Sequence, residues 1–126
     1  MVRYCVMWKF KPSDVKTSKE LAEDVKEKYE SLLGLVPGLK SIEVGVNRNE
    51  GKTSYDAVML ADFDDWEALA AYKADTLRGN VIEYVKTIAD VRAKVEYERY
   101  DNILKRKGLH DGGPSFFISY RSLSAS

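Results

Sequence analysis

The sequence predicts an α+β domain with the ferredoxin-like order β-α-β-β-α-β, in which helices cover one face of an antiparallel sheet. Three observations lead to this fold. Residues 2–10 are apolar at nearly every position, helical periodicity occurs in two regions, and alternating segments precede, separate and follow those regions. A length of 126 residues suits one domain with its own core. We expect that domain to span residues 1–103, and a basic, then glycine-rich C-terminal tail to span residues 104–126.

The first strand is apolar on both of its faces, which bears on assembly as well as fold. Cys5 and Met7 lie on one face. The other face carries a large side chain at every second position, namely Tyr4, Val6, Trp8 and Phe10. Two helical regions can cover only one face of the sheet, so the other face needs a separate cover. We therefore expect a homodimer in which the chain is its own partner and the two sheets pack face to face.

The first helical region follows this strand. Thr17 and Glu20 have the spacing of a capping box, and apolar residues recur at intervals of three and four as far as Leu33. The Pro37-Gly38 pair cannot continue a helix and predicts a turn. A second strand then alternates over residues 41–46.

The remaining elements follow a polar loop. A third strand is predicted over Tyr55–Phe63, and Asp64 with Glu67 has cap spacing for a second helix that carries Trp66 and Tyr72. The pattern breaks at Asp75-Thr76, so we expect this helix to kink or restart. A further helical segment and a last strand over residues 91–100 complete the order.

Composition excludes several classes of protein. Lysine plus arginine equals aspartate plus glutamate at 20 each, so no net charge attracts nucleic acid or an anionic membrane. The third strand has neither the basic residues nor the paired exposed aromatic residues of an RNA-recognition module. A single cysteine rules out a Cys-x-x-Cys metal site and a disulfide framework. No apolar run is long enough to span a bilayer and no signal-peptide pattern begins the chain, so we expect a cytoplasmic protein.

Residues that could supply acid–base or metal chemistry are few. The only histidine, His110, lies in the predicted tail, where we expect it to be solvated. Asp62, Asp64 and Asp65 could hold a hard cation, but such residues more often cap a helix, and we favour capping. Cys5 lacks a nearby histidine to activate it. We expect no metal and no cofactor, so acid–base work falls to tyrosine, carboxylate or lysine.

Several short motifs, in order and spacing, resemble the stress-responsive A/B barrel (Dabb) family over about residues 2–98. The segments that carry the resemblance are Val2–Pro12, Val36–Gly45, Tyr55-Asp56, Leu69–Tyr72 and Val81–Lys86. The resemblance implies a ferredoxin-like monomer whose sheet pairs with that of a second copy, forming a dimeric α+β barrel. This expectation agrees with the two-faced first strand.

The resemblance also implies site residues. A plant polyketide cyclase similar to this chain, which forms olivetolic acid, works with two tyrosines and two histidines in a pocket between helices and sheet. Its tyrosine positions match Tyr29 and Tyr72 here, while Tyr4 stands in place of the strand histidine and Asp75-Thr76-Leu77-Arg78 replaces the His-Pro-x-His segment. A tyrosine of pKa about 10 is a poorer base near neutral pH than a neutral imidazole.

From these matches we expect catalytic roles for Tyr4, Tyr29 and Tyr72. Arg78 cannot be a base, but its fork can bind a carboxylate or an enolate-like oxygen. The expected substrate-binding residues are Arg78, Trp8 and Asp75.

Three functions stay open at this point. The first is a homodimeric barrel that binds a small, mostly apolar molecule carrying a carbonyl or carboxylate, with a polyketide-cyclase-like or lyase activity. The second is a non-catalytic stress-response or carrier protein with the same pocket. The third is a cofactor-free monooxygenase of the related dimeric-barrel kind, for which Trp8 and Trp66 could be cited, although tryptophan more often packs in a core.

Overall fold

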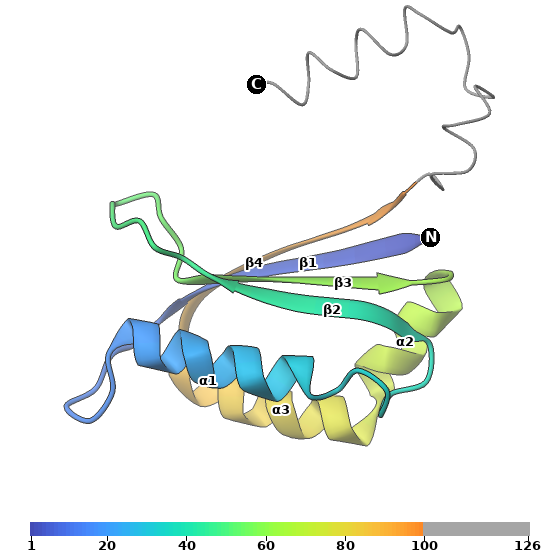
Figure 1. The fold of residues 1–126 in the computed structure, drawn as a ribbon, viewed down its shortest axis with the longest axis horizontal. Coiled ribbons are helices and arrows are strands. Elements are labelled where there is room, and N and C mark those ends of the chain that lie inside the picture. Colours follow the sequence, from blue (N-terminus) through green and yellow to red (C-terminus); the bar gives the residue numbers. More distant parts are fainter. Residues whose placement is uncertain (100–126) are drawn as a thin grey trace, which may run out of the picture.

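A computed structural model of the chain describes residues 1–99. Its elements are β1 (Val2–Phe10), α1 (Ser18–Glu30), β2 (Leu39–Val46), β3 (Ala57–Phe63), α2 (Trp66–Ala74), α3 (Thr76–Ile88) and β4 (Ala89–Glu98). The four strands form one antiparallel sheet in the order β2-β3-β1-β4, and the three helices lie on one face of it (Figure 1). The predicted ferredoxin-like α+β fold is confirmed. The predicted tail, the predicted domain end at residue 103 and His110 lie outside the described residues.

Strand β1 runs through the middle of the sheet, between β3 and β4. The alternation expected for it is present. Its helix-facing side chains are buried, with exposed fractions of 4% or less: Tyr4, Val6, Trp8 and Phe10. On the opposite face, Met7 is 40% exposed and Cys5 is half-buried. One face of β1 therefore belongs to the core and the other lies on the uncovered face of the sheet.

Helix α1 begins as the sequence predicts and ends earlier than expected. The Thr17 hydroxyl accepts from the Glu20 amide, and the Glu20 carboxylate accepts from the Thr17 amide, which completes the capping box. The helix ends at Glu30, so the placement of Leu33 on its apolar face was wrong. Leu33 lies in the turn that follows and is 49% exposed, because the chain leaves the helical spiral before reaching it.

The second helical region consists of two helices, as the break at Asp75-Thr76 indicated. Asp75 caps α3, where one carboxylate oxygen accepts from the amides of Leu77 at 2.8 Å and Arg78 at 3.2 Å. The cap of α2 is Asp65, which accepts from the Ala68 amide at 2.8 Å. The prediction of Asp64 as that cap was wrong by one residue.

Strand boundaries differ from prediction for local reasons. Strand β3 begins at Ala57 rather than at Tyr55, because Asp56 uses its carboxylate to accept from the Phe10 amide at 2.7 Å. Strand β4 begins at Ala89, since α3 runs into it without an intervening loop. No helix within residues 1–99 is long and apolar enough to cross a membrane.

Candidate functional site

Four of the expected site residues lie together in the core between helices and sheet. Tyr4 and Trp8 come from β1, Tyr29 from α1 and Tyr72 from α2, and none is more than 3% exposed. The rings of Trp8 and Tyr29 stack with their centroids 5.5 Å apart. Tyr4 meets Tyr72 edge to face at 6.5 Å. The helix periodicity and strand alternation that placed these residues on inward faces thus bring them into one aromatic cluster.

Tyr72 lies at the centre of this cluster and is fully buried. Its ring also packs against Phe63, with centroids 5.1 Å apart. Its hydroxyl donates to the sulfur of Met59 at 4.0 Å. A thioether is a weak acceptor, so the hydroxyl retains most of its capacity to bond a stronger partner.

Arg78 joins the cluster from the first turn of α3. Its guanidinium carbon lies 5.4 Å from the centre of the Tyr72 ring, within the range of a cation–π contact. One terminal nitrogen, Nη1, donates to the Lys73 carbonyl at 3.2 Å. The Nε atom is buried and has no hydrogen-bond partner among residues 1–99. A buried donor without a partner is costly, and such groups often mark a place where a ligand or water binds.

Asp75, also expected to bind substrate, lies beside this arginine but has a structural task. One of its carboxylate oxygens holds the first two free amides of α3, including that of Arg78. The cap thereby fixes where α3 begins and from which point the Arg78 side chain projects. Its contact with a substrate remains a prediction.

Burial sets the protonation of the tyrosines. It raises the pKa of Tyr72 to about 12, with the positive charge of Arg78 acting in the opposite direction. Burial likewise raises the pKa of Tyr29, and the neighbouring Tyr72 adds to the effect. Both hydroxyls therefore keep their protons near neutral pH. They can donate hydrogen bonds to a carbonyl or an oxyanion, but they are poor bases.

Charged side chains of β4 border the cluster, and sequence reasoning did not single them out. Strand pairing places Arg92 beside Trp8, Lys94 beside Val6 and Glu96 beside Tyr4. Glu96 forms an ion pair with Lys73, whose ammonium nitrogen lies 5.1 Å from the centre of the Tyr4 ring. The available signal was the period-two alternation of Arg92, Lys94, Glu96 and Glu98 in a strand with Val95 and Tyr97 between them.

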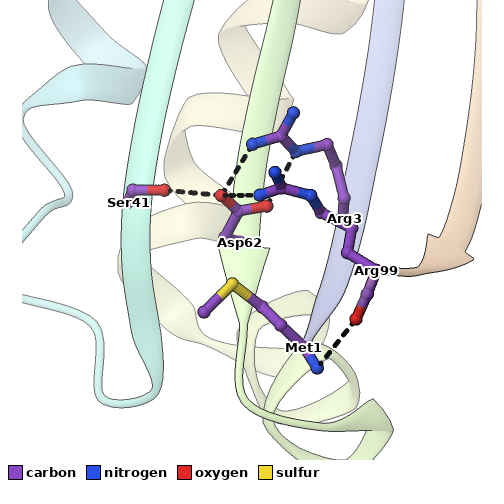
Figure 2. A network of polar contacts seen from close by, with 5 residues as sticks. All are labelled: Met1, Arg3, Ser41, Asp62 and Arg99. Carbon is purple, nitrogen blue, oxygen red and sulfur yellow. Dashed lines mark hydrogen bonds and ion pairs between the residues drawn. The ribbon is translucent and has the colours of Figure 1, made fainter. Parts of the chain in front are cut away.

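The opposite face of the sheet holds a separate polar network at one end (Figure 2). Asp62 accepts two hydrogen bonds from Arg3, at 2.8 and 2.9 Å, one from Arg99 at 3.2 Å and one from the Ser41 hydroxyl at 3.0 Å. Hydrogen bonding to Arg3 lowers the pKa of Asp62, which is 6% exposed. Asp62 thus neither caps a helix nor joins Asp65 in a metal site. No group of three potential metal ligands occurs within residues 1–99.

The middle of this uncovered face, on β3, β1 and β4, is apolar. Adjacent strands align Leu60, Cys5 and Val95 in one row and Val58, Met7 and Ala93 in the next. Val95 is 60% exposed and Met7 is 40% exposed. In a single chain these side chains meet water, which is unusual for a contiguous apolar patch.

Comparison with known proteins agrees with this architecture. A dimeric ferredoxin-like protein from Bacteroides fragilis has 25% identity and a TM-score of 0.68, covering 78% of this chain and 95% of its own. A dimeric ferredoxin-like protein from Thermobifida fusca has 19% identity and a TM-score of 0.66, covering 78% and 90%. A hydroxynitrile lyase from Passiflora edulis has 12% identity and a TM-score of 0.64, covering 79% and 96%. No curated protein gives a significant match.

The last two likenesses establish the fold alone, because their sequence identity is low. The family is established by a separate finding. The model of the stress responsive A/B barrel domain, Dabb, matches residues 2–99. This range covers the four strands and three helices and confirms the resemblance noted in the sequence. The chain therefore belongs to the stress responsive A/B barrel domain family.

Proposed function

We propose that the aromatic cluster between helices and sheet binds a small, mostly apolar molecule that carries a carbonyl or a carboxylate. The observation that carries the proposal is Arg78, whose buried Nε atom has no partner among residues 1–99. A ligand oxygen placed at this nitrogen would satisfy it. The Tyr72 ring, over which Arg78 lies, and the Tyr4 ring next to it would contact the apolar body of such a ligand.

The groups that the cluster offers to such a ligand are hydrogen-bond donors and a positive charge. Tyr29 and Tyr72 keep their protons, since burial raises the pKa of each. Together with Arg78 they can stabilise negative charge that develops on a carbonyl oxygen. This arrangement supports a polyketide-cyclase-like or lyase activity. In that activity the substrate itself or a water molecule, rather than a protein side chain, would act as the base that takes a proton from the substrate. The second candidate is a non-catalytic carrier, which would bind its ligand through the same contacts. Tyr29 and Tyr72 are poor bases, and a carrier does not require a base.

We also propose that the protein is a homodimer whose uncovered sheet faces pack together. The three helices lie on the other face, so nothing within residues 1–99 covers Met7, Val91 or Val95 (Figure 1). The dimeric relative from Bacteroides fragilis has the same fold over most of this chain. A second copy would remove the exposed apolar rows from water, and burial of apolar surface contributes about 25 cal/mol per Å².

A ligand screen by thermal shift tests the binding proposal. The panel consists of straight-chain and aromatic carboxylates and the corresponding methyl ketones. A compound present at 100 times its dissociation constant should stabilise the wild-type chain by about 2.7 kcal/mol. Arg78→Gln should weaken its binding by about 1–3 kcal/mol, the range for a charged hydrogen bond.

Arg48→Gln is the matched control for that screen, because Arg48 is exposed in the loop between β2 and β3 and lies outside the cluster. It should bind as the wild type does. Failure of every compound to stabilise the wild-type chain would contradict the proposal. Equal binding by the wild type and Arg78→Gln would remove Arg78 from it. Turnover of a bound ketone would separate the enzyme from the carrier.

A further inference from the structure

The helix-facing side of β4 carries cations next to the aromatic cluster. Strand β4 is an edge strand, and its pairing with β1 sets Arg92 beside Trp8 and Lys94 beside Val6. The β1 partners are buried, whereas Arg92 and Lys94 are exposed. The boundary between core and solvent therefore runs along this edge, and the charges lie directly on that boundary.

These cations are not neutralised locally. Glu96, on the same side of β4, forms an ion pair with Lys73, and Asp90, two residues from Arg92, forms no ion pair within residues 1–99. Glu98 accepts a hydrogen bond from the Trp66 indole at 2.8 Å. Within residues 1–99, Arg92 and Arg78 take part in none of the ion pairs. Arg78 and Arg92 thus lie beside the cluster without a carboxylate partner within residues 1–99.

The two arginines approach the cluster from different elements. Arg78 extends from the start of α3 and stacks on Tyr72, while Arg92 extends from β4 next to Trp8. Trp8 stacks on Tyr29 with ring centroids 5.5 Å apart, so Tyr29 and Arg92 are both neighbours of Trp8. Burial raises the pKa of Tyr29, and the positive charges of Arg78 and Arg92 each lower it by a smaller amount. Both arginines therefore lie close enough to Tyr29 to act on its hydroxyl.

We propose that Arg92 is a second recognition residue of the proposed site, and that with Arg78 it selects ligands ending in a carboxylate over neutral ligands of the same shape. This inference rests on the proposed function and narrows its ligand class from carbonyl or carboxylate to apolar monocarboxylates. Two guanidiniums from different elements can each donate to a carboxylate oxygen. An alcohol would gain only one weaker bond, and the apolar body would remain in the aromatic cluster.

The test uses matched pairs of straight-chain acids and alcohols, from hexanoate with hexanol to dodecanoate with dodecanol. Dissociation constants are measured by calorimetry for the full chain, for Arg92→Gln and for Arg48→Gln. The wild type should bind the best acid at least tenfold more tightly than its alcohol. Arg92→Gln should weaken acid binding by about tenfold and leave alcohol binding unchanged. Arg48→Gln removes an equal charge from a distant loop and should change neither.

The outcomes separate this inference from the proposed function. Equal affinity for acid and alcohol, or an Arg92→Gln chain that keeps the wild-type preference, overturns the role of Arg92 and leaves the apolar site standing. A wild-type chain that binds no member of either series overturns the inference, and it overturns the proposed function as well only if the methyl ketones and aromatic carboxylates of the first panel also fail to bind. Arg92→Lys keeps the charge without the fork and should restore part of the preference for the acid, whereas a merely structural role predicts no change in preference for any Arg92 variant.

Discussion

Both faces of the sheet carry large apolar side chains, but those side chains are buried on one face and exposed on the other. On the helix side, Trp8 and Tyr4 are 1% and 3% exposed. On the uncovered side, Met7 of the same strand β1 is 40% exposed, and Val95 of the paired strand β4 is 60% exposed. The helix-side residues already have their packing partners within the chain. Those of the uncovered side do not.

The polar groups of the two faces differ in whether their hydrogen bonds are satisfied. On the uncovered face, the Asp62 carboxylate is saturated by Arg3, Arg99 and Ser41 (Figure 2). On the helix face, Arg78 has a buried donor without a partner among residues 1–99. A satisfied network suits a surface that another copy will cover, whereas an unsatisfied donor suits a site that a ligand will enter. The comparison thus supports the proposed assembly through the uncovered face and the proposed ligand binding on the helix face.

The largest effect is expected from a charge on the uncovered face. Met7→Asp places one carboxylate in each half of the proposed interface, and an unpaired buried charge costs about 3–5 kcal/mol. Light scattering at micromolar concentration should show a dimer for the wild type and a monomer or an unfolded chain for Met7→Asp. Val15→Asp is the control, since Val15 is 83% exposed in the loop before α1, and this variant should remain dimeric. If Met7→Asp formed a dimer of wild-type affinity, the uncovered face would not be the dimer interface.

The next effect concerns the helix face. Trp8→Ala removes a side chain that is 1% exposed and should lower the free energy of unfolding by about 3–5 kcal/mol. Trp66→Ala makes the same chemical change at a residue that is 45% exposed, and about 1 kcal/mol is expected from its hydrogen bond to Glu98. Urea unfolding at one fixed protein concentration measures both. Equal losses for the two variants would show that the aromatic cluster is not the core of the fold.

The Asp62 network should contribute somewhat less. Asp62→Asn leaves Arg3 without its carboxylate and should cost about 3 kcal/mol near neutral pH, the lower end for a buried pair because both guanidiniums stay partly solvated. Asp14→Asn, at an exposed carboxylate, should have little effect. Urea unfolding near pH 7 measures the two variants. An unchanged free energy of unfolding for Asp62→Asn would show that the network does not contribute to stability.

The same network fixes a pH dependence. Folding lowers the pKa of Asp62, so its contribution is present above the unfolded pKa of about 3.9 and is lost as the pH falls through the lower folded value. The stability difference between wild type and Asp62→Asn should therefore shrink in acid. A difference that grew as the pH fell would have the wrong sign for this assignment.

The smallest effect is expected at the cap of α3. Asp75→Ala removes the acceptor of the Leu77 and Arg78 amides and should cost about 1 kcal/mol of stability. Asp75→Asn keeps a capping oxygen and should be nearly neutral for folding. Thermal unfolding compares the two, and ligand affinity of Asp75→Asn then reports whether the charge itself matters for binding. Equal destabilisation by both variants would contradict the capping role.

The sequence was sufficient to predict features that depend on local spacing. The capping box at Thr17 follows from two residues three positions apart, and the two faces of β1 follow from alternation within nine residues. The break at Asp75 was equally local. The end of α1 was not predicted, since Leu33 continues the apolar spacing beyond the point where the helix stops. The inward direction of Tyr4, Tyr29 and Tyr72 followed from periodicity, but their mutual packing required the fold.

Features that depend on strand register could not be predicted. Arg3 and Asp62 are 59 residues apart in the chain and meet only because β1 pairs with β3 in one register. Arg92 reaches the side of Trp8 through the pairing of β1 with β4, which no local pattern specifies. A shift by one residue would have exchanged the two faces of β4 and moved Arg92 away from the aromatic cluster.

The proposed ligand site lies on the helix side of the sheet and not on its uncovered side. Methyl-resolved NMR of the full chain with a saturating straight-chain acid tests this placement most directly. Val81, Ile82 and Val85 report on the helix side, whereas Val58, Val91 and Val95 report on the uncovered side. We predict ligand-dependent shifts at the first three methyl-bearing residues and unchanged resonances at the second three. Shifts confined to Val58, Val91 and Val95 would place the ligand on the uncovered face and contradict this account.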